Sequence, residues 1–517
     1  MAKNIVLDAL IPREDFEVED DTSGTTRNVA TIGARDLEYD SFFFSALRKP
    51  DFQRETNEWD AKRIVSLIES FISGDLIPAV ILWRDSASYT FVIDGAHRLS
   101  ALASWINNDF GDGEISKEFY DGIIPEEQIL ASENTRKAVR KQIGLFSDYQ
   151  LALRNPDKVE PHIAEKAKSL GALAIQVQWV EGDSKKAESS FFKINQQAAS
   201  IDKTELKLLK SRRKPAGIAT RAILRSGKGH KYWSSYEENV QSDIQHLAEE
   251  INEIIFQPSL TNPIKTLDLP VGGKNFSSQG QSLILELVNK TNNIDKNSEE
   301  MDDIDGQKTV RYLNNCLKVV RRLNSVHPSS LGLHPAIYFY SKDGRHKPAS
   351  FWAAIEFIQQ LEKANKFSWF TETRSDFEIF LQKYDYIIQQ VVRKYRSAST
   401  AYPHIAKLYF VVIDCLKYGV AIDDLPTKIR ANSDFSFITL SDEGAEEVTS
   451  KDFSRERKSE VFIREAIESA VKCSICVGLL HKNSITIDHI ERKEDGGLGV
   501  VENGQLAHPY CNSTYKN

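Results

Sequence analysis

The strongest constraint on folding lies near the C-terminus, where four side chains with metal-ligand chemistry occur in two short pairs. They are Cys473, Cys476, His508 and Cys511. Two residues separate the members of each pair, a spacing that can place three thiolates and an imidazole around one tetrahedral zinc ion. The chain between the pairs must then fold back so that its ends meet. A module of about fifty residues has little core of its own, so a structural zinc ion is physically expected.

A second set of polar side chains lies between and beside these pairs. Asp488 and His489 are adjacent, Asn503 follows them, and Asn512 comes directly after the last cysteine. Carboxylate and amide oxygens suit Mg²⁺ or Mn²⁺, and an imidazole with a pKa of about 6.5 can accept a proton from water. A purely structural zinc knuckle has no need of such groups. The pattern therefore favours a catalytic centre, with a zinc knuckle and an incidental Asp-His pair as the alternative.

In this order and spacing, residues 470–517 resemble the HNH endonucleases. The resemblance implies a ββα-metal fold, in which a β-hairpin and a helix enclose a divalent ion. By position, His489 would be the general base, and Asp488 and Asn512 would bind Mg²⁺ or Mn²⁺. Asn503 would support the loop that carries the base. The two outer pairs would hold the structural zinc ion.

A second constellation lies in the first third of the chain. Residues 80–83 and 89–93 predict a β-hairpin that ends at Asp94-Gly95, and a helix is expected over residues 97–107. A glycine that allows close backbone approach, a helix N-terminus and the Arg98 guanidinium can together bind a phosphate group. Taken alone, a structural strand-turn-helix explains the same residues as well.

Together with Phe52-Gln53-Arg54, Trp59 and residues 191–206, this segment resembles a known domain. It is the ParB/sulfiredoxin-like N-terminal domain of GmrSD-type restriction enzymes and of SspE-like phage-defence proteins. The resemblance covers about residues 40–210 and implies an α+β domain that binds or hydrolyses nucleoside triphosphates and can sense DNA modification. The implied nucleotide contacts are Gln53, Arg54, Asp94, Gly95, His97 and Arg98.

Two departures from that family's pattern are visible. Ala96 and His97 stand where the family has two glutamines, and Ala198 stands where a glycine is usual. The sequence therefore leaves open which nucleotide is bound and whether it is hydrolysed. For each single contact residue, a surface charge or a helix cap is the alternative interpretation.

The length of 517 residues is typical of about three domains. We expect the ParB/sulfiredoxin-like α+β domain at 1–215 and an all-helical middle domain at 216–430, where apolar residues recur with helical spacing. Residues 431–458 are rich in Ser, Asp, Glu and Lys and predict a linker. Residues 459–517 form the zinc-stabilised HNH module. The predicted fold class is a multidomain α+β protein.

Composition bears on the partners and the cellular location of the protein. The net charge of −8 argues against a protein that coats nucleic acid, although basic clusters occur at residues 136–141 and 207–214. Five cysteines, three of them in the terminal motif, do not form a disulfide framework, and the apolar runs are too short to cross a bilayer. We therefore expect a cytoplasmic protein that does not associate with membranes, and the sequence leaves its oligomeric state open.

The leading hypothesis is a divalent-metal-dependent HNH DNA endonuclease or nickase, regulated by an N-terminal nucleotide-binding or NTPase domain. It would act in bacterial anti-phage defence or modification-dependent restriction, with phage or modified DNA and a nucleoside triphosphate as partners. One alternative is a nucleotide-gated DNA-binding regulator whose zinc module is not catalytic. Another makes the N-terminal domain the main enzyme, an NTPase or a sulfiredoxin-like phosphotransferase. The trigger, the use of RNA, and nicking against double-strand cleavage stay open.

Overall fold

A computed structural model of the chain forms two compact units, and each is described here by itself. Unit 1 comprises Met1–Arg212 and Lys228–Tyr232, and unit 2 comprises Arg213–Gly227 and Trp233–Asn517. The structure describes residues 4–14, 16, 28–51, 53, 59–85, 89–120, 122, 124, 126–198, 203–228, 231–274, 278–295, 300–440 and 452–516.

Unit 1 is built on a mixed six-stranded sheet with the strand order β1-β3-β5-β4-β6-β2. β4 and β5 are antiparallel neighbours, as the predicted hairpin requires. β3 runs parallel to β5, and β6 runs parallel to β4, so each strand of the hairpin also pairs with a segment that is distant in sequence. The strands are β1 (Arg13–Glu14), β2 (Thr31–Gly33), β3 (Leu47–Pro50), β4 (Val80–Arg84), β5 (Thr90–Asp94) and β6 (Ala174–Trp179).

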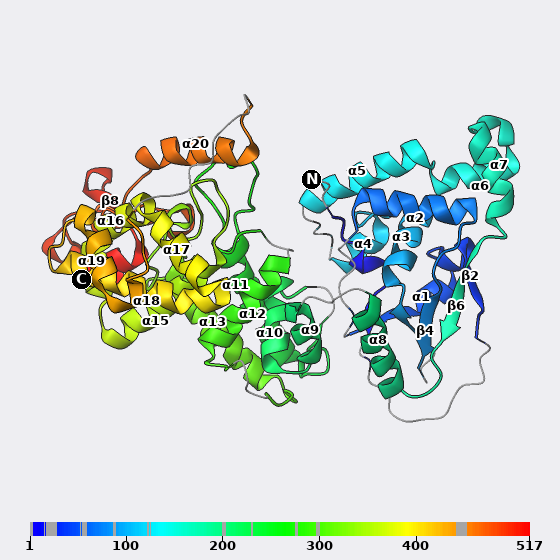
Figure 1. Cartoon of the computed structure of the whole chain (residues 1–517), viewed down its shortest axis with the longest axis horizontal. Helices are drawn as coiled ribbons and strands as arrows, with labels where there is room; N and C mark the ends of the chain where they lie inside the picture. Colours follow the sequence, from blue (N-terminus) through cyan, green and yellow to red (C-terminus); the bar gives the residue numbers. More distant parts are fainter. Residues whose placement is uncertain are drawn as a thin grey trace. The chain divides into compact units, whose positions relative to one another are not determined.

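Helices cover both faces of this sheet (Figure 1). Leu82 and Val92 face a large apolar core that includes side chains of α2, α3, α5, α6 and α7. Trp83 and Phe91 point the other way and pack with Phe191 of α8. The alternation along each strand therefore buries both faces, and the polar end of β5 is left to begin the turn into α3.

The helices of unit 1 are α1 (Phe42–Ala46), α2 (Ala61–Ser73), α3 (Ala96–Ile106), α4 (Glu114–Phe119), α5 (Glu126–Gln142), α6 (Phe146–Arg154), α7 (Pro161–Leu170), α8 (Ser184–Ala198) and α9 (Lys203–Lys210). Short 3₁₀ helices are η1 (Asp8–Leu10), η2 (Ala34–Leu37) and η3 (Pro156–Lys158). α2 begins at Ala61 because the Asp60 carboxylate accepts a hydrogen bond from the Arg63 amide at 2.9 Å and caps the helix.

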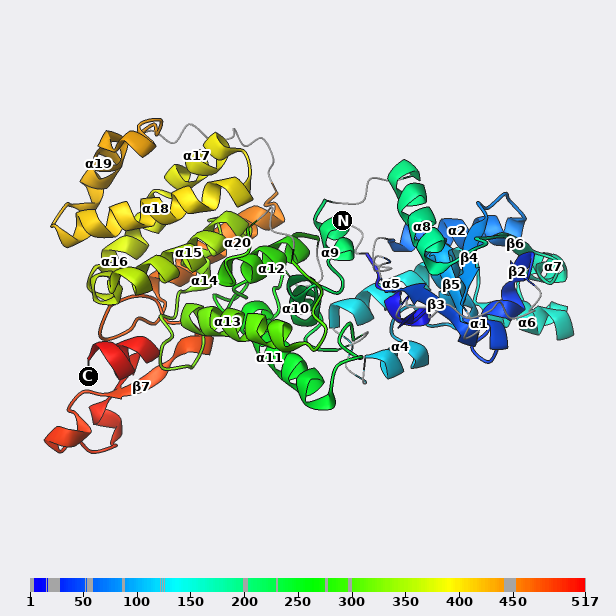
Figure 2. The same ribbon diagram turned by 90° about the horizontal axis from the view of Figure 1, so that it is seen from below.

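Unit 2 is helical up to its last segment (Figures 1 and 2), which confirms the predicted helical middle. None of the helices in the described part of the chain has the length and apolar character needed to span a bilayer. Its helices are α10 (Pro215–Leu224), α11 (Glu238–Phe256), α12 (Ser278–Thr291), α13 (Gln307–Leu323), α14 (Pro335–Tyr338), α15 (Pro348–Ala364), α16 (Phe367–Lys383), α17 (Asp385–Tyr395), α18 (Ala398–Lys417), α19 (Leu425–Ala431) and α20 (Arg455–Glu468). Its 3₁₀ helices are η4 (Ile422–Asp424), η5 (Ser433–Phe435), η6 (Lys482–Ser484), η7 (Lys493–Asp495) and η8 (Val501–Asn503).

The last segment of unit 2 is a small hairpin followed by one helical turn. β7 (Thr486–His489) pairs with β8 (Gly504–Ala507) in antiparallel register, and a single π-helical turn, η9 (Cys511–Tyr515), follows. Figure 2 shows β7 beside this turn, with the loop between the strands projecting beyond the helices. The overall class, a multidomain α+β protein with a helical middle and a terminal ββα-metal module, is as predicted.

The predicted domain boundaries at 215, 430 and 458 stay predictions. Within the predicted linker, residues 441–451 lie outside the described residues, and α20 begins at Arg455. The terminal hairpin and the helical region belong to the same compact unit.

Candidate functional site

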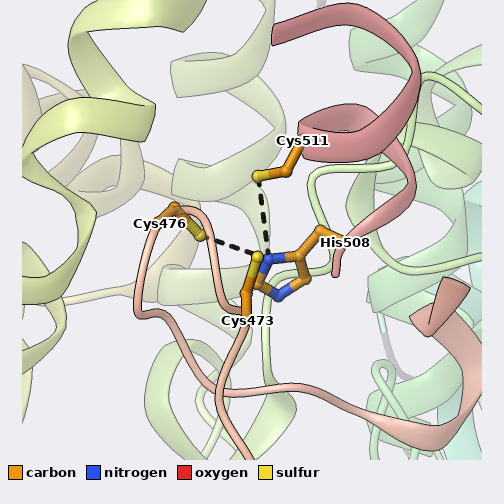
Figure 3. Close-up of side chains that lie close together, drawn as sticks. All are labelled: Cys473, Cys476, His508 and Cys511. Atoms are coloured by element: carbon orange, nitrogen blue, oxygen red, sulfur yellow. Dashed lines mark hydrogen bonds between the residues drawn. The ribbon is translucent and has the colours of Figure 1, made fainter. Parts of the chain in front are cut away.

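The structure brings the four outer ligand residues of the terminal segment together (Figure 3). The ligand atoms of Cys473, Cys476, His508 and Cys511 all lie within 4.8 Å of one another, and all four residues are buried. The His508 Nδ1 atom lies 3.3 Å from the Cys476 sulfur and 4.0 Å from the Cys511 sulfur. Ligand atoms around a tetrahedral zinc ion lie about 3.5–3.8 Å apart, so the four atoms are gathered to nearly the spacing that a bound zinc ion requires.

The protonation states of the three thiols and the imidazole bear on whether the cluster can bind a cation. Hydrogen bonds from the two other cysteines lower the pKa of the Cys473 thiol, and the bond to Cys473 raises the pKa of Cys476 to about 11. Hydrogen bonds to Cys473 hold the pKa of both Cys476 and Cys511 above its usual value, so ionisation of all three thiols would need a bound positive charge. Burial lowers the pKa of His508, with the nearby Arg374 charge acting in the same direction, so the imidazole is neutral and able to ligate.

A backbone contact selects the tautomer of the imidazole ligand. His508 Nε2 lies 3.0 Å from the carbonyl oxygen of Leu479. Donation to this oxygen leaves the lone pair on Nδ1, which is the nitrogen that faces the sulfurs. The Cys3His set therefore fits a structural zinc ion in ligand chemistry, spacing and orientation.

Asp488 lies inside the hairpin. It alternates on β7 with Ile487, which is 63% exposed, while Asp488 is 5% exposed. The Asp488 Oδ2 atom accepts hydrogen bonds from Gln505 Nε2 and Lys516 Nζ, both at 2.7 Å. Gln505 stands opposite Asp488 in the β7–β8 register, and Lys516 follows η9. Both strands and the final turn thus meet at one carboxylate.

Asn512 contacts the same hairpin at the strand β7. Its side-chain nitrogen, Nδ2, lies 3.2 Å from the Ile487 carbonyl oxygen and 3.3 Å from the Thr486 hydroxyl. The residue occupies the first turn of η9, next to the ligand Cys511. The zinc cluster therefore holds Asn512 against β7, the strand that carries Asp488.

His489 is the last residue of β7 and follows Asp488 directly. Its backbone carbonyl accepts a hydrogen bond from the Lys516 ammonium. Its imidazole makes no hydrogen bond to any other residue in the described part of the chain, so none of those residues fixes its tautomer.

Asn503 closes the loop that follows His489. Its Oδ1 accepts from the Glu491 amide at 2.8 Å, and its Nδ2 donates to the carbonyls of Leu498 at 2.9 Å and Glu491 at 3.2 Å. Its own carbonyl accepts from the Ile490 amide at 2.9 Å. One side chain therefore ties together both ends of the loop.

The second predicted site surrounds a cavity of about 150 Å³ in unit 1. Of the six predicted nucleotide contacts, five line this cavity, and Arg54 lies outside the described residues. Ligand pockets for whole nucleotides are commonly about 300 Å³ or larger, so the cavity in this conformation accommodates a phosphate-sized group. Its lining residues are Gln53, Trp59, Asp94, Gly95, Ala96, His97, Arg98 and Phe191.

The turn from β5 into α3 depends on Gly95. Its φ is +100°, and a Cβ atom there would lie 2.6 Å from Val80 Cγ1. This turn places Asp94 and Arg98 on the cavity wall, where Arg98 Nη2 donates to Asp94 Oδ2 at 2.8 Å and to the Ala79 carbonyl at 3.2 Å. The guanidinium is held at the first turn of the helix, where a phosphate would also meet free backbone amides.

Two further walls of the cavity are an imidazole and an amide. The His97 ring stacks on Trp59, with ring centroids 5.9 Å apart. Gln53 is 7% exposed, and its Oε1 has no hydrogen-bond partner among the described groups. The backbone carbonyl of Gln53 accepts a hydrogen bond from the Arg13 guanidinium, which also forms an ion pair with the buried Asp8. A buried polar atom without a partner beside a cavity indicates a place for a ligand or water.

Comparison with known proteins identifies two segments of the chain. Residues 38–213 match the family model described as the GmrSD restriction endonuclease, N-terminal domain, and residues 473–517 match the model described as HNH endonuclease. The chain thus joins a GmrSD-type N-terminal domain to an HNH domain. No curated protein and no solved structure matched it. The two domains support an HNH nuclease of restriction-type defence, with DNA as its substrate class.

The predicted basic clusters of the GmrSD-type domain are partly neutralised. Arg136 forms two hydrogen bonds with Asp112, at 2.5 and 3.0 Å. Arg212 lies 2.9 Å from Asp51 and 3.1 Å from Glu188. These side chains stabilise the unit's own surface more directly than they present positive charge to DNA.

Two residues of the HNH site were not predicted from the sequence. They are Gln505 and Lys516, which bind Asp488. The position of Gln505, two residues after Asn503 in a predicted hairpin, was a usable signal. Lys516 carried no local signal.

Proposed function

We propose that the chain is a divalent-metal-dependent DNA endonuclease or nickase whose cleavage centre lies between β7 and η9 of the HNH domain. The observation that carries the proposal is that Asn512, beside the Cys3His cluster, contacts β7, the strand that carries the buried Asp488. A structural zinc knuckle alone does not need a buried carboxylate on the strand that this asparagine contacts. Zinc would hold the fold, and Mg²⁺ or Mn²⁺ would serve the chemistry.

His489 is the proposed general base. At the end of β7 its imidazole would accept a proton from water, which then attacks the phosphodiester in line. Asp488 and Asn512 would provide hard oxygen ligands for Mg²⁺ or Mn²⁺. A bound divalent ion would neutralise charge on the phosphate and on the leaving oxygen. Asn503 would keep the loop after His489 closed, and the resemblance to HNH enzymes implies 5′-phosphate and 3′-hydroxyl products.

The test is cleavage of supercoiled plasmid by purified protein with Mg²⁺ or Mn²⁺. His489→Ala should abolish nicking, and its zinc content and melting temperature should stay at the wild-type values because the imidazole makes no hydrogen bond within the described fold. Wild-type cleavage by His489→Ala would refute the proposed base.

For the GmrSD-type domain we propose a regulatory role in which the phosphates of a nucleoside triphosphate enter the cavity at the start of α3. The support is the cavity, the Arg98 guanidinium on its wall and the Gln53 Oε1 atom, which has no hydrogen-bond partner among the described residues. Arg98→Met should weaken nucleotide binding at least tenfold, because it removes a charge-assisted contact to phosphate. Its melting temperature should hardly change, since the Asp94–Arg98 pair is partly exposed. Nucleotide binding is measured by isothermal titration calorimetry, and unchanged affinity would remove Arg98 from the site.

The biological setting we propose is cytoplasmic defence against phage, with phage or modified DNA as substrate. Cleavage of modified and unmodified phage DNA, with and without each nucleoside triphosphate, tests the trigger directly. An NTPase or phosphotransferase as the main activity would give phosphate release that survives Asn512→Ala and is lost in Arg98→Met.

One observation favours a second candidate, a nucleotide-gated DNA-binding regulator. The His489 imidazole has no partner within the described structure to orient it, whereas catalytic bases are usually held by a second group. A regulator would shift the mobility of the plasmid without nicking it under any combination of metal and nucleotide. Nicking that depends on His489 excludes this candidate.

A further inference from the structure

One side chain of the helical region lies directly beside the zinc cluster. Arg374 of α16 is 2% exposed. Its Nη2 donates to the Gly332 carbonyl at 2.8 Å, and its Nη1 donates to the Leu331 carbonyl. The same Nη1 lies 3.3 Å from His508 Nδ1, the nitrogen that faces the sulfurs. The guanidinium therefore contacts both a loop of the helical region and a ligand of the cluster.

Glu378, one turn further along α16, extends the contact. Its Oε1 accepts from Arg374 Nε at 2.8 Å, and its Oε2 accepts from the Leu479 amide at 3.0 Å. The Leu479 carbonyl lies 3.0 Å from His508 Nε2. A continuous set of hydrogen bonds thus runs from α16, through both backbone groups of Leu479, to the imidazole ligand.

Two glycines show how closely these groups approach. A Cβ atom at Gly478 would lie 2.3 Å from Arg374 Nε, and one at Gly332 would lie 2.4 Å from His508 Cδ2. Gly332 also has a φ of +59°. The chain is therefore packed against the guanidinium and the imidazole at a distance that a side chain would prevent.

The positive charge of Arg374 can stabilise the negative charge of the cluster. The Arg374 guanidinium is charged, because arginine keeps its proton throughout the pH range in which proteins are folded. Three thiolates and one zinc ion would carry a net charge of −1, which a neighbouring guanidinium stabilises in a buried site.

We propose that Arg374 is a positioning residue of the zinc site and that, with Glu378, it makes α16 an integral part of the HNH domain. Its charge stabilises the thiolates, and it holds the Glu378 carboxylate, which fixes the Leu479 backbone against the His508 ring. Because Cys511 is followed directly by Asn512, the same contacts determine where Asn512 meets β7. The proposal concerns the zinc ligands, so it can fail or succeed independently of DNA cleavage.

Substitution of cobalt for zinc in the full-length protein tests the role of Arg374. The energy of the thiolate-to-cobalt charge-transfer band depends on the charge around the three sulfurs. Arg374→Met removes a positive charge next to them and raises the energy of their electrons, so the band should move to longer wavelength. Zinc transfer to a chelator should become at least about tenfold faster, the usual effect of losing an outer contact to a metal ligand. Arg374→Lys keeps the charge and loses the fork, so it should restore the band position and only part of the zinc retention.

A matched control separates this role from general destabilisation. Lys347→Met breaks another ion pair of the helical region, Lys347–Asp385 at 2.8 Å, which touches none of the four ligands in the described structure. It should lower the melting temperature without changing the cobalt band or zinc transfer. A wild-type band and wild-type zinc transfer in Arg374→Met overturn the proposal, and so do equal changes in the control. If Arg374→Met does not fold, wild-type zinc transfer in both Arg374→Lys and Glu378→Gln overturns it.

Discussion

The loop after His489 offers a sharp test of how the HNH domain is organised. Asn503 closes it with three side-chain hydrogen bonds, two to the backbone of Glu491 and one to Leu498, at 2.8 to 3.2 Å. Surface hydrogen bonds of this kind contribute about 0.5–1 kcal/mol each. Asn503→Ala should therefore cost loop closure about 2 kcal/mol, which corresponds to about thirtyfold more frequent opening.

Hydrogen exchange at the Glu491 amide measures this opening, because that amide donates to Asn503 Oδ1. We expect exchange to rise about thirtyfold in Asn503→Ala, and the single-turnover rate of plasmid cleavage to fall. Zinc content should not change, since the four ligands lie outside the loop. Asn503→Asp keeps the acceptor and loses both donations, so its exchange should be intermediate. Wild-type exchange in Asn503→Ala, or loss of its zinc, would refute the reasoning.

Two further predictions concern stability. Gly95→Ala would place a Cβ atom 2.6 Å from Val80 Cγ1 at a φ of +100°, so it should destabilise unit 1 by about 1–3 kcal/mol in chemical denaturation; a neutral effect would contradict the packing at this turn. Burial lowers the pKa of His481 from 6.5 to about 4, so the unfolded state takes up a proton that the folded state refuses, and stability is lost as pH falls from 6.5 towards 4. His481→Asn should flatten the pH dependence of the unfolding free energy in this window, and an unchanged slope would show that other groups cause it.

The parts of the fold that depend on local sequence could be predicted. Cys473 and Cys476 are brought together by a single turn, and β4 and β5 by one short connection, so residue type and spacing were enough. The helical region followed from the period of its apolar residues. A strand over residues 172–180 was predictable, but the parallel pairing of β3 and β6 with the hairpin was not, because it joins segments far apart in the chain.

The same limit explains what was missed in the candidate sites. The sequence indicated Asp488 and Asn512 because their residue types suit a hard cation in a recognisable order. It did not indicate that Lys516 and Gln505 hold one oxygen of Asp488. Those partners depend on the register of the hairpin and on the path of the final turn. Such partners orient a ligand without resembling one, and sequence patterns record ligands far better.

The buried residues of the HNH domain explain why its partners reach into the helical region. Its apolar core consists of three cysteine ligands with Leu480 and Ala507, so most of what it buries is the metal site itself. A core of this kind cannot hold a hairpin without zinc, and zinc fixes only the four ligands. The remaining order must come from outside, and the contacts of Arg374 and Glu378 supply it at the turn that begins with Cys473. On this proposal β7 with Asp488 and η9 with Asn512 are positioned by α16 as well as by the metal, which gives the helical region a direct physical route to the proposed cleavage centre.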